Sequence, residues 1–119
     1  MKRDMDLIRE LLIDIEEDPT FDGKWHDWVL PGHTQAELCY HVLLAKEAGL
    51  IEARVLPNTT IFNIKRLTYE GHEFLEAARD QNRWTKAKDT VVKSTGALTL
   101  EALKTVLGLL MKQALTGGM

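Results

Sequence analysis

Several features that would classify the chain at once are scarce or missing. Of its 119 residues only Cys39 is a cysteine, so an internal disulfide is impossible and nothing indicates a disulfide-stapled secreted domain. The apolar run at residues 106–111 lies between two lysines and is far shorter than the ~20 residues that span a bilayer. Aspartates at positions 4 and 6 stand where a signal peptide would need an apolar run. We therefore expect a cytoplasmic protein with no membrane segment.

The motifs that mark common catalytic and metal centres are also missing. The chain has no GxSxG, P-loop or GxGxxG segment, and His72-Glu73 is not followed by the second histidine of HExxH. The histidines at 26, 33, 41 and 72 lack the close paired spacing of zinc ligands, so isolated surface histidines are the simpler interpretation. Cys39 lies on the apolar side of a predicted helix, where a thiol is expected to be buried and unreactive. We expect no enzyme, no metal and no cofactor.

What is present is a series of amphipathic segments in a chain of ordinary soluble composition, with 45% hydrophobic and 28% charged residues. Apolar residues at helical spacing follow Asp4 and predict a first helix that ends before Pro19. Residues 19–33 form a turn-rich connection in which two tryptophans are expected to pack against the body, the alternative being an aromatic binding surface, with a short strand at 28–30. Thr34 and Glu37 form a capping box that begins the next helix, over residues 34–48.

A hairpin and further helices follow. Residues 51–55 and 62–66 alternate in polarity around a turn at 57–60, which predicts two short antiparallel strands. Thr68 is a cap for the next helix, and two more helices are predicted from about residue 83 and from Thr99. Helix, hairpin, helix is the order of a winged-helix domain. We predict an α+β, mainly helical fold, with a winged-helix-like domain at 1–82, a short β-hairpin wing, and a C-terminal helical extension at 83–119.

Three motifs, in this order, carry a resemblance to a known group: MKRDMDLIRELL, YHVLLAKEAGLI and RLTYEGHEFLEAARD. They resemble a family of small bacterial and phage-associated proteins of unknown function, over roughly residues 1–95. The resemblance implies a winged-helix-like fold and no established activity. More distantly, HVLLAKEAGLI and LTYEGHEFL are similar to the recognition helix and post-wing helix of bacterial winged-helix regulators. Those regulators place a separate helix before the recognition helix, where this chain has the Pro/Gly/Trp-rich segment 19–33.

Charge is unevenly distributed along the chain. Residues 1–49 carry five Lys/Arg against eleven Asp/Glu, giving −6, whereas residues 50–119 carry ten against seven, giving +3. Because phosphate contact needs positive charge, a surface for double-stranded DNA is expected in the hairpin or beyond it. Four residues are the candidate DNA contacts: Gln35, Arg54, Lys65 and Arg66.

The helix at 34–48 carries the wrong charge for reading DNA. If Leu38, Val42 and Ala45 face the core, the opposite stripe holds two carboxylates and no Arg or Lys to meet base edges, and Lys46 lies off it. This stripe suits a protein interface, with these candidates: Glu37, Tyr40, His41, Leu44 and Glu47. The alternative is that Tyr40 and Leu44 pack against segment 19–33.

The last predicted helix is apolar around much of its circumference, which indicates burial on more than one side. A two-fold homodimer is the commonest way to bury such a helix, and the alternative is that it folds back over the hairpin and the first helix. The candidate dimer contacts are Leu103, Val106, Leu107, Leu110 and Met111.

The sequence thus supports two functional hypotheses. The first, favoured by fold and family analogy, is a DNA-binding transcriptional regulator of bacterial or phage origin. The second, favoured by the surface chemistry of residues 34–48, is a protein-interaction adaptor on a winged-helix scaffold without DNA binding.

Overall fold

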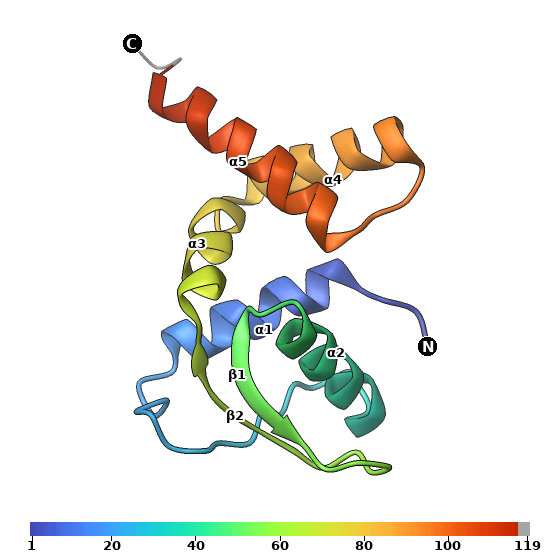
Figure 1. Ribbon diagram of the computed structural model, residues 1–119, viewed down its shortest axis with the longest axis vertical. Coiled ribbons are helices and arrows are strands. Elements are labelled where there is room, and N and C mark those ends of the chain that lie inside the picture. The colour runs from blue at the N-terminus through green and yellow to red at the C-terminus, as the bar shows by residue number, and fades with distance from the viewer. Residues whose placement is uncertain (117–119) are drawn as a thin grey trace. The chain divides into compact units, whose positions relative to one another are not determined.

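The computed structural model describes residues 1–116. Within these residues there are five helices and one two-stranded antiparallel hairpin (Figure 1). Their order is α1 (Met5–Glu17), α2 (Gln35–Glu47), β1 (Ile51–Val55), β2 (Phe62–Leu67), α3 (Tyr69–Ala78), α4 (Gln81–Thr95) and α5 (Leu100–Thr116). The predicted α+β, mainly helical class with a short hairpin is confirmed.

The chain divides into two compact units, Met1–His72 and a second unit that begins at Glu73. The sequence places the boundary later, after residue 82, whereas the units meet within α3. Each unit is described by itself.

Helix α1 begins where the sequence predicts, because the Asp4 carboxylate accepts a hydrogen bond from the Leu7 amide. Its apolar stripe is buried and packs against α2 and β2. The buried residues of the stripe are Met5, Leu7, Ile8, Leu11, Leu12 and Ile15. This stripe forms one wall of the core of the first unit.

Helix α2 is bounded by a polar cap and a glycine. The Thr34 hydroxyl accepts a hydrogen bond from the Glu37 amide at its start. At its end Gly49 adopts a left-handed φ of 77°, which a glycine takes at little cost. Leu38, Val42 and Ala45 are buried as predicted, and α2 contacts α1 and both strands.

The hairpin places apolar residues inward and polar residues outward. Ile51 lies opposite Leu67 and Val55 opposite Phe62, and the register shifts by one residue after Glu52. This β-bulge leaves Lys65 without a partner on β1 and increases the local twist. The buried residues of the hairpin are Ile51, Ala53, Phe62, Ile64 and Leu67.

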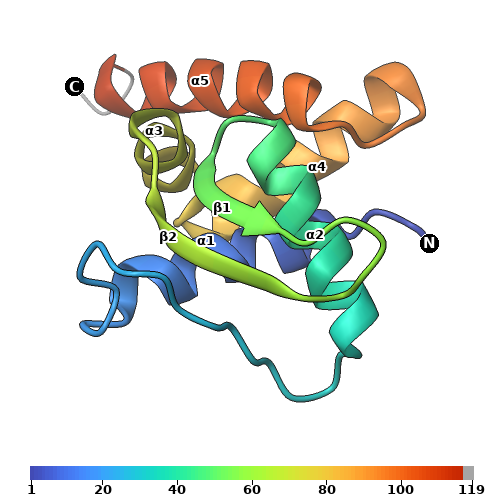
Figure 2. The same ribbon diagram turned by 60° about the horizontal axis from the view of Figure 1, so that its bottom comes forward.

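The connection at residues 19–33 runs along the outside of the first unit from α1 to α2 (Figure 2). The expected strand at 28–30 is not formed. Instead His26 pairs with Ile64 through two backbone hydrogen bonds of 2.8 Å, so the strand-like contact falls a few residues earlier. Trp28 is buried and its Nε1 donates to the Asp14 carboxylate at 2.9 Å, which explains why its side chain turns inward.

Backbone contacts join the ends of the hairpin to the end of α2. The Thr68 amide donates to the Leu50 carbonyl oxygen at 3.0 Å, and the Thr68 hydroxyl donates to the carbonyl oxygen of Gly49. The same hydroxyl accepts from the Gly71 amide at 3.0 Å and so caps α3. A side chain at position 71 would overlap the backbone of Leu50.

The second unit contains a helical hairpin formed by α4 and α5 (Figure 1). Asp80 caps α4 at its start and Gly96, with a φ of 75°, ends it. Trp84 is buried and meets Phe74 edge to face, with 6.2 Å between ring centroids. The Thr99 hydroxyl accepts from the Ala102 amide and begins α5. In the part of the chain that the structure describes, no helix is both long enough and apolar enough to cross a membrane.

Replacing Gly71 with alanine should destabilise the first unit, because the new methyl group would collide with the Leu50 backbone rather than with a movable side chain. We expect Gly71→Ala to lower the free energy of unfolding by about 1–3 kcal/mol, as overpacking does. Urea unfolding followed by circular dichroism measures the change.

Gly108→Ala is the matched control, since a methyl group on this helical glycine would meet no atom within 4 Å. Alanine should there raise the free energy of unfolding by roughly 0.5–1 kcal/mol. An unchanged unfolding midpoint for Gly71→Ala would contradict the close approach.

Candidate functional site

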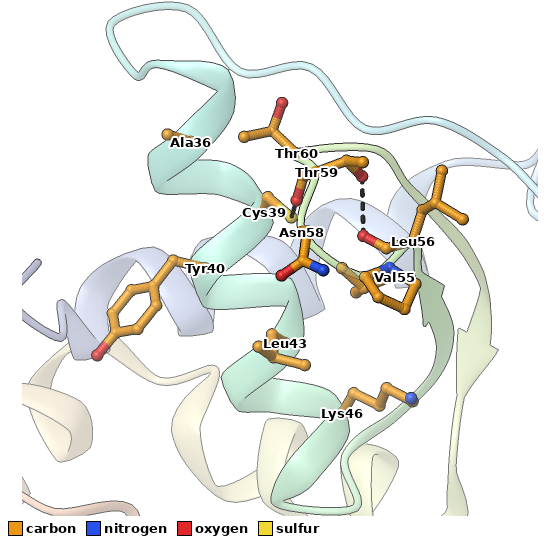
Figure 3. A pocket seen from close by; sticks show the side chains of 11 residues that line it. Ala36, Cys39, Tyr40, Leu43, Lys46, Val55, Leu56, Asn58, Thr59 and Thr60 are labelled. Carbon is orange, nitrogen blue, oxygen red and sulfur yellow. Dashed lines mark hydrogen bonds between the residues drawn. The ribbon is translucent and has the colours of Figure 1, made fainter.

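A cleft of 440 Å³ lies between α2 and the turn of the hairpin (Figure 3). We call it the α2–turn cleft. Helix α2 lines it with Ala36, Cys39, Tyr40, Leu43 and Lys46, and the hairpin lines it with Val55, Leu56, Pro57, Asn58, Thr59 and Thr60. The α2 residues recur at intervals of three or four, so they follow one face of the helix.

Hydrogen bonds hold the turn beside the start of α2. The Gln35 side-chain amide donates to the carbonyl oxygen of Thr60 at 2.8 Å. The Thr59 hydroxyl donates to the carbonyl oxygen of Leu56 at 2.8 Å, and Asn58 adopts a left-handed φ of 62°. The Cys39 thiol lies 3.9 Å from the carbonyl oxygen of Thr59. These contacts give the cleft a defined second wall.

The cleft is mainly apolar and has one charged lining residue. Figure 3 shows Leu43 and Lys46 reaching toward the hairpin, while the ring of Tyr40 points away from the turn. Lys46 is exposed, and no carboxylate in residues 1–116 forms an ion pair with it. Leu56 is 53% exposed at the edge. Such a surface can bind an apolar group beside an anionic one.

The cleft is poorly equipped for covalent chemistry. Cys39 is buried, and burial raises the pKa of its thiol above the ordinary value, so little thiolate is present at neutral pH. No histidine or carboxylate lines the cleft to act as its base. Elsewhere among the described residues no group of three or more His, Cys, Asp or Glu side chains could hold a metal ion.

The structure corrects the predicted outer stripe of α2. His41 is only 2% exposed, because it lies three residues after Leu38 and four before Ala45 and therefore shares their buried face. The expectation that His41 is exposed is wrong. The face of α2 toward the hairpin turn is formed by Ala36, Cys39, Tyr40, Leu43 and Lys46, so Lys46 lies on the cleft face and not on the predicted stripe.

The other predicted residues of this stripe are spread around the helix. Leu44 is half-buried and Glu47 is exposed, and neither lines the cleft. Glu37 lies 3.1 Å from His33 Nδ1, and the hydrogen bond from His33 lowers the pKa of the Glu37 carboxyl. Glu37 therefore stabilises the start of α2.

His41 joins α1 to α2. Its Nδ1 lies 2.7 Å from the carbonyl oxygen of Glu37, which can only accept, so Nδ1 carries the proton. Its Nε2 is then the acceptor for the Asp4 amide at 2.8 Å. Both ring nitrogens are satisfied in a neutral ring that links the cap of α1 to the middle of α2.

Three of the four predicted DNA-contact residues lie on the outer face of the hairpin. The Arg54 guanidinium stacks over the ring of Trp25 at 4.4 Å, and Lys65 Nζ lies 5.5 Å from the same ring. Arg54 Nε donates to Asn63 at 3.3 Å, and Asn63 donates to Asp27 at 2.9 Å. We call Trp25, Arg54, Asn63 and Lys65 the ribbon cluster. Gln35 lies apart from it, at the hairpin turn.

A single carboxylate offsets much of the positive charge on this face. Glu52 lies 3.6 Å from Lys65 Nζ and 3.1 Å from Arg66 Nε. Arg66 also donates to the carbonyl oxygen of Leu67 at 3.0 Å. Exposed pairs of this kind are worth about 0–1 kcal/mol each, but they reduce the charge offered to a phosphate.

The predicted dimer contacts divide into buried and half-buried residues of α5. Leu103 and Leu107 are buried, whereas Val106, Leu110 and Met111 are half-buried. Leu109 and Leu115, which the sequence did not single out, are exposed. Dimerisation through α5 stays a prediction.

Sequence reasoning missed Leu43, Leu56 and the position of Lys46. The spacing of Ala36, Tyr40 and Leu43 on one helical face was a readable signal. The turn that forms the opposite wall was not, since its position depends on contacts such as that between Gln35 and Thr60. The stacking of Arg54 on Trp25 likewise joins residues far apart in sequence.

Removing the His41 ring should leave the part-buried Asp4 amide without its acceptor and remove the link between α1 and α2. We expect His41→Leu to lower the free energy of unfolding by about 1–3 kcal/mol, the cost of leaving a polar group unsatisfied. His33→Leu is the control, because its partner Glu37 is partly exposed and the loss should be about 1 kcal/mol or less. Equal unfolding midpoints for the two variants would show that the His41 contacts do not stabilise the fold.

The comparisons with known proteins agree with the resemblance carried by the three motifs. The family described as "Hypothetical protein (DUF2513)" matches residues 2–97. An uncharacterized protein of Haemophilus influenzae is 32% identical over 117 residues, which cover 97% of this chain and 99% of that protein. No solved structure matches the chain. Association with phage and the winged-helix-like character of the fold stay predictions. The chain belongs to the DUF2513 family of hypothetical proteins.

Proposed function

We propose that the protein is an interaction module whose α2–turn cleft binds a segment of another protein. The observation that carries the proposal is the mainly apolar lining of this cleft between α2 and the hairpin turn. Leu43, Val55 and Leu56 offer no hydrogen bonds to base edges or phosphates. Apolar side chains of this kind form the centres of protein interfaces.

The charge of the first unit supports the same proposal. Residues 1–72 contain eight Lys/Arg and thirteen Asp/Glu, a formal net charge of −5. A negative unit repels the phosphate backbone, whose attraction supplies most non-specific DNA affinity. The proposed role is binding without catalysis, because the only thiol is buried and has no base beside it.

A charged side chain introduced into the cleft should weaken binding of the partner. We expect Leu43→Lys to weaken binding at least about tenfold, since burial of a leucine contributes roughly 1.5–3 kcal/mol. Quantitative mass spectrometry of proteins captured by the tagged full chain would identify what is lost, and calorimetry with the purified partner would give the affinity.

Val29→Lys is the matched control, because Val29 is 79% exposed and does not line the cleft. The partner should remain bound to this variant. Capture of the same proteins by Leu43→Lys and by the unmodified chain would remove the support for a cleft-bound partner.

DNA binding by the hairpin is the second candidate, and the ribbon cluster favours it. Trp25 gathers two cations on one face, and Arg54 is held both by the ring and by Asn63. An arginine positioned in this way loses less conformational freedom when it meets a phosphate. The negative charge of the unit and the pairing of Glu52 with Lys65 and Arg66 place this candidate second.

If the hairpin binds duplex DNA, affinity should fall steeply with salt, and Arg54→Ala should reduce the salt slope by about one. Fluorescence anisotropy with a short random-sequence duplex across a salt series measures both quantities. Lys93→Ala is the control, since Lys93 pairs with Asp89 on α4 and is remote in sequence from the hairpin. No retained duplex at low salt would eliminate this candidate.

A further inference from the structure

We infer that the segment bound in the α2–turn cleft presents a large apolar side chain next to a carboxylate. This inference rests on the proposed function and names the chemistry of the partner. It follows from the placement of one unpaired cation at one end of an otherwise uncharged cleft.

Lys46 supplies the charge. It lies in the last turn of α2, is exposed, and its ammonium group has no carboxylate partner among the described residues. No acidic residue lines the cleft, so nothing within it competes for this cation. A carboxylate arriving with a ligand would form a charge-assisted hydrogen bond there.

The apolar part of the ligand has its own place. Leu43 faces Val55, Leu56 and Pro57, and the cleft volume of 440 Å³ falls within the range of about 300–1,000 Å³ typical of small-molecule sites. An aromatic ring or a large aliphatic side chain therefore fits. Since Leu43 and Lys46 are one helical turn apart, the apolar group and the carboxylate of the ligand lie within a few residues of each other.

The opposite end of the cleft has no charged lining residue. There the Gln35 amide already donates to Thr60, and the Thr59 hydroxyl already donates to Leu56. The two ends therefore differ, which orients a bound segment with its carboxylate toward the C-terminal end of α2. The net charge of −5 on the first unit opposes acidic ligands at long range, but this effect is screened beyond about 8–10 Å in physiological salt. At contact distance the attraction between the Lys46 ammonium and the ligand carboxylate outweighs this long-range repulsion.

Three indole probes of similar shape test the inference on the full-length protein: indole-3-acetate, which is anionic, 3-methylindole, which is neutral, and tryptamine, which is cationic. Each is titrated into the ¹⁵N-labelled chain and followed by amide chemical shifts. All three should perturb residues that line the cleft, and the anion should bind about two- to fivefold more tightly than the neutral probe, as an exposed ion pair allows. Tryptamine should bind most weakly.

Charge variants at Lys46 provide the matched comparison. Lys46→Gln should make the anionic and neutral probes bind equally, and Lys46→Glu should reverse the order so that tryptamine binds best. Lys46 is exposed, so both variants should keep the amide spectrum of the folded protein.

The outcomes separate this inference from the proposed function. If the neutral probe binds in the cleft but the order of the probes does not change in Lys46→Glu, the inference is overturned and the proposed function stands. If no probe perturbs the cleft, the inference is overturned, and the Leu43→Lys comparison decides the proposed function. If cleft shifts instead follow protein concentration without any probe, a second copy of the chain is the occupant and the inference is overturned.

Discussion

The backbone junction between α2 and the hairpin is the constraint on which the first unit depends. The Leu50 carbonyl accepts from the Thr68 amide, the Gly49 carbonyl accepts from the Thr68 hydroxyl, and Gly71 packs against Leu50 without a side chain between them. Gly49 and Leu50 end α2 and lead into β1, and they accept hydrogen bonds from Thr68, which follows β2 and caps α3. Because both hairpin ends are held there, the turn between them is directed back along α2, where it forms the cleft wall.

Local signals in the sequence were sufficient for the helices and the hairpin but not for the short strand expected at 28–30 or for the site. Asp4, Thr34 and Gly96 marked helix ends by cap chemistry that acts over three or four residues. His41 was misplaced because a polar residue type outweighed its spacing from Leu38 and Ala45. The contact of Arg54 with Trp25 depends on the path of residues 19–33, which no local pattern encodes. Burial of a polar group is decided by its hydrogen-bond partners, and these come from other elements.

The fold and the surface chemistry of this chain point to different partners. The order of helix and hairpin is shared with DNA readers, yet the exposed side of α2 and the hairpin turn together form an apolar cleft. The positive charge lies on another face of the hairpin, where the Glu52 carboxylate pairs with two of the cations. The fold alone is therefore a weak guide to function, and the solvent-exposed side chains are the better indication of what the protein binds.

The β-bulge at Lys65 makes the electrostatic character of the hairpin depend on one residue. Because the bulge inserts an extra residue, Lys65 and Arg66 are consecutive in sequence yet both reach Glu52. A single replacement of Glu52 by a neutral residue would release two cations beside Arg54 without disturbing the core. Relatives that differ at this one position would present surfaces of very different charge on the same scaffold.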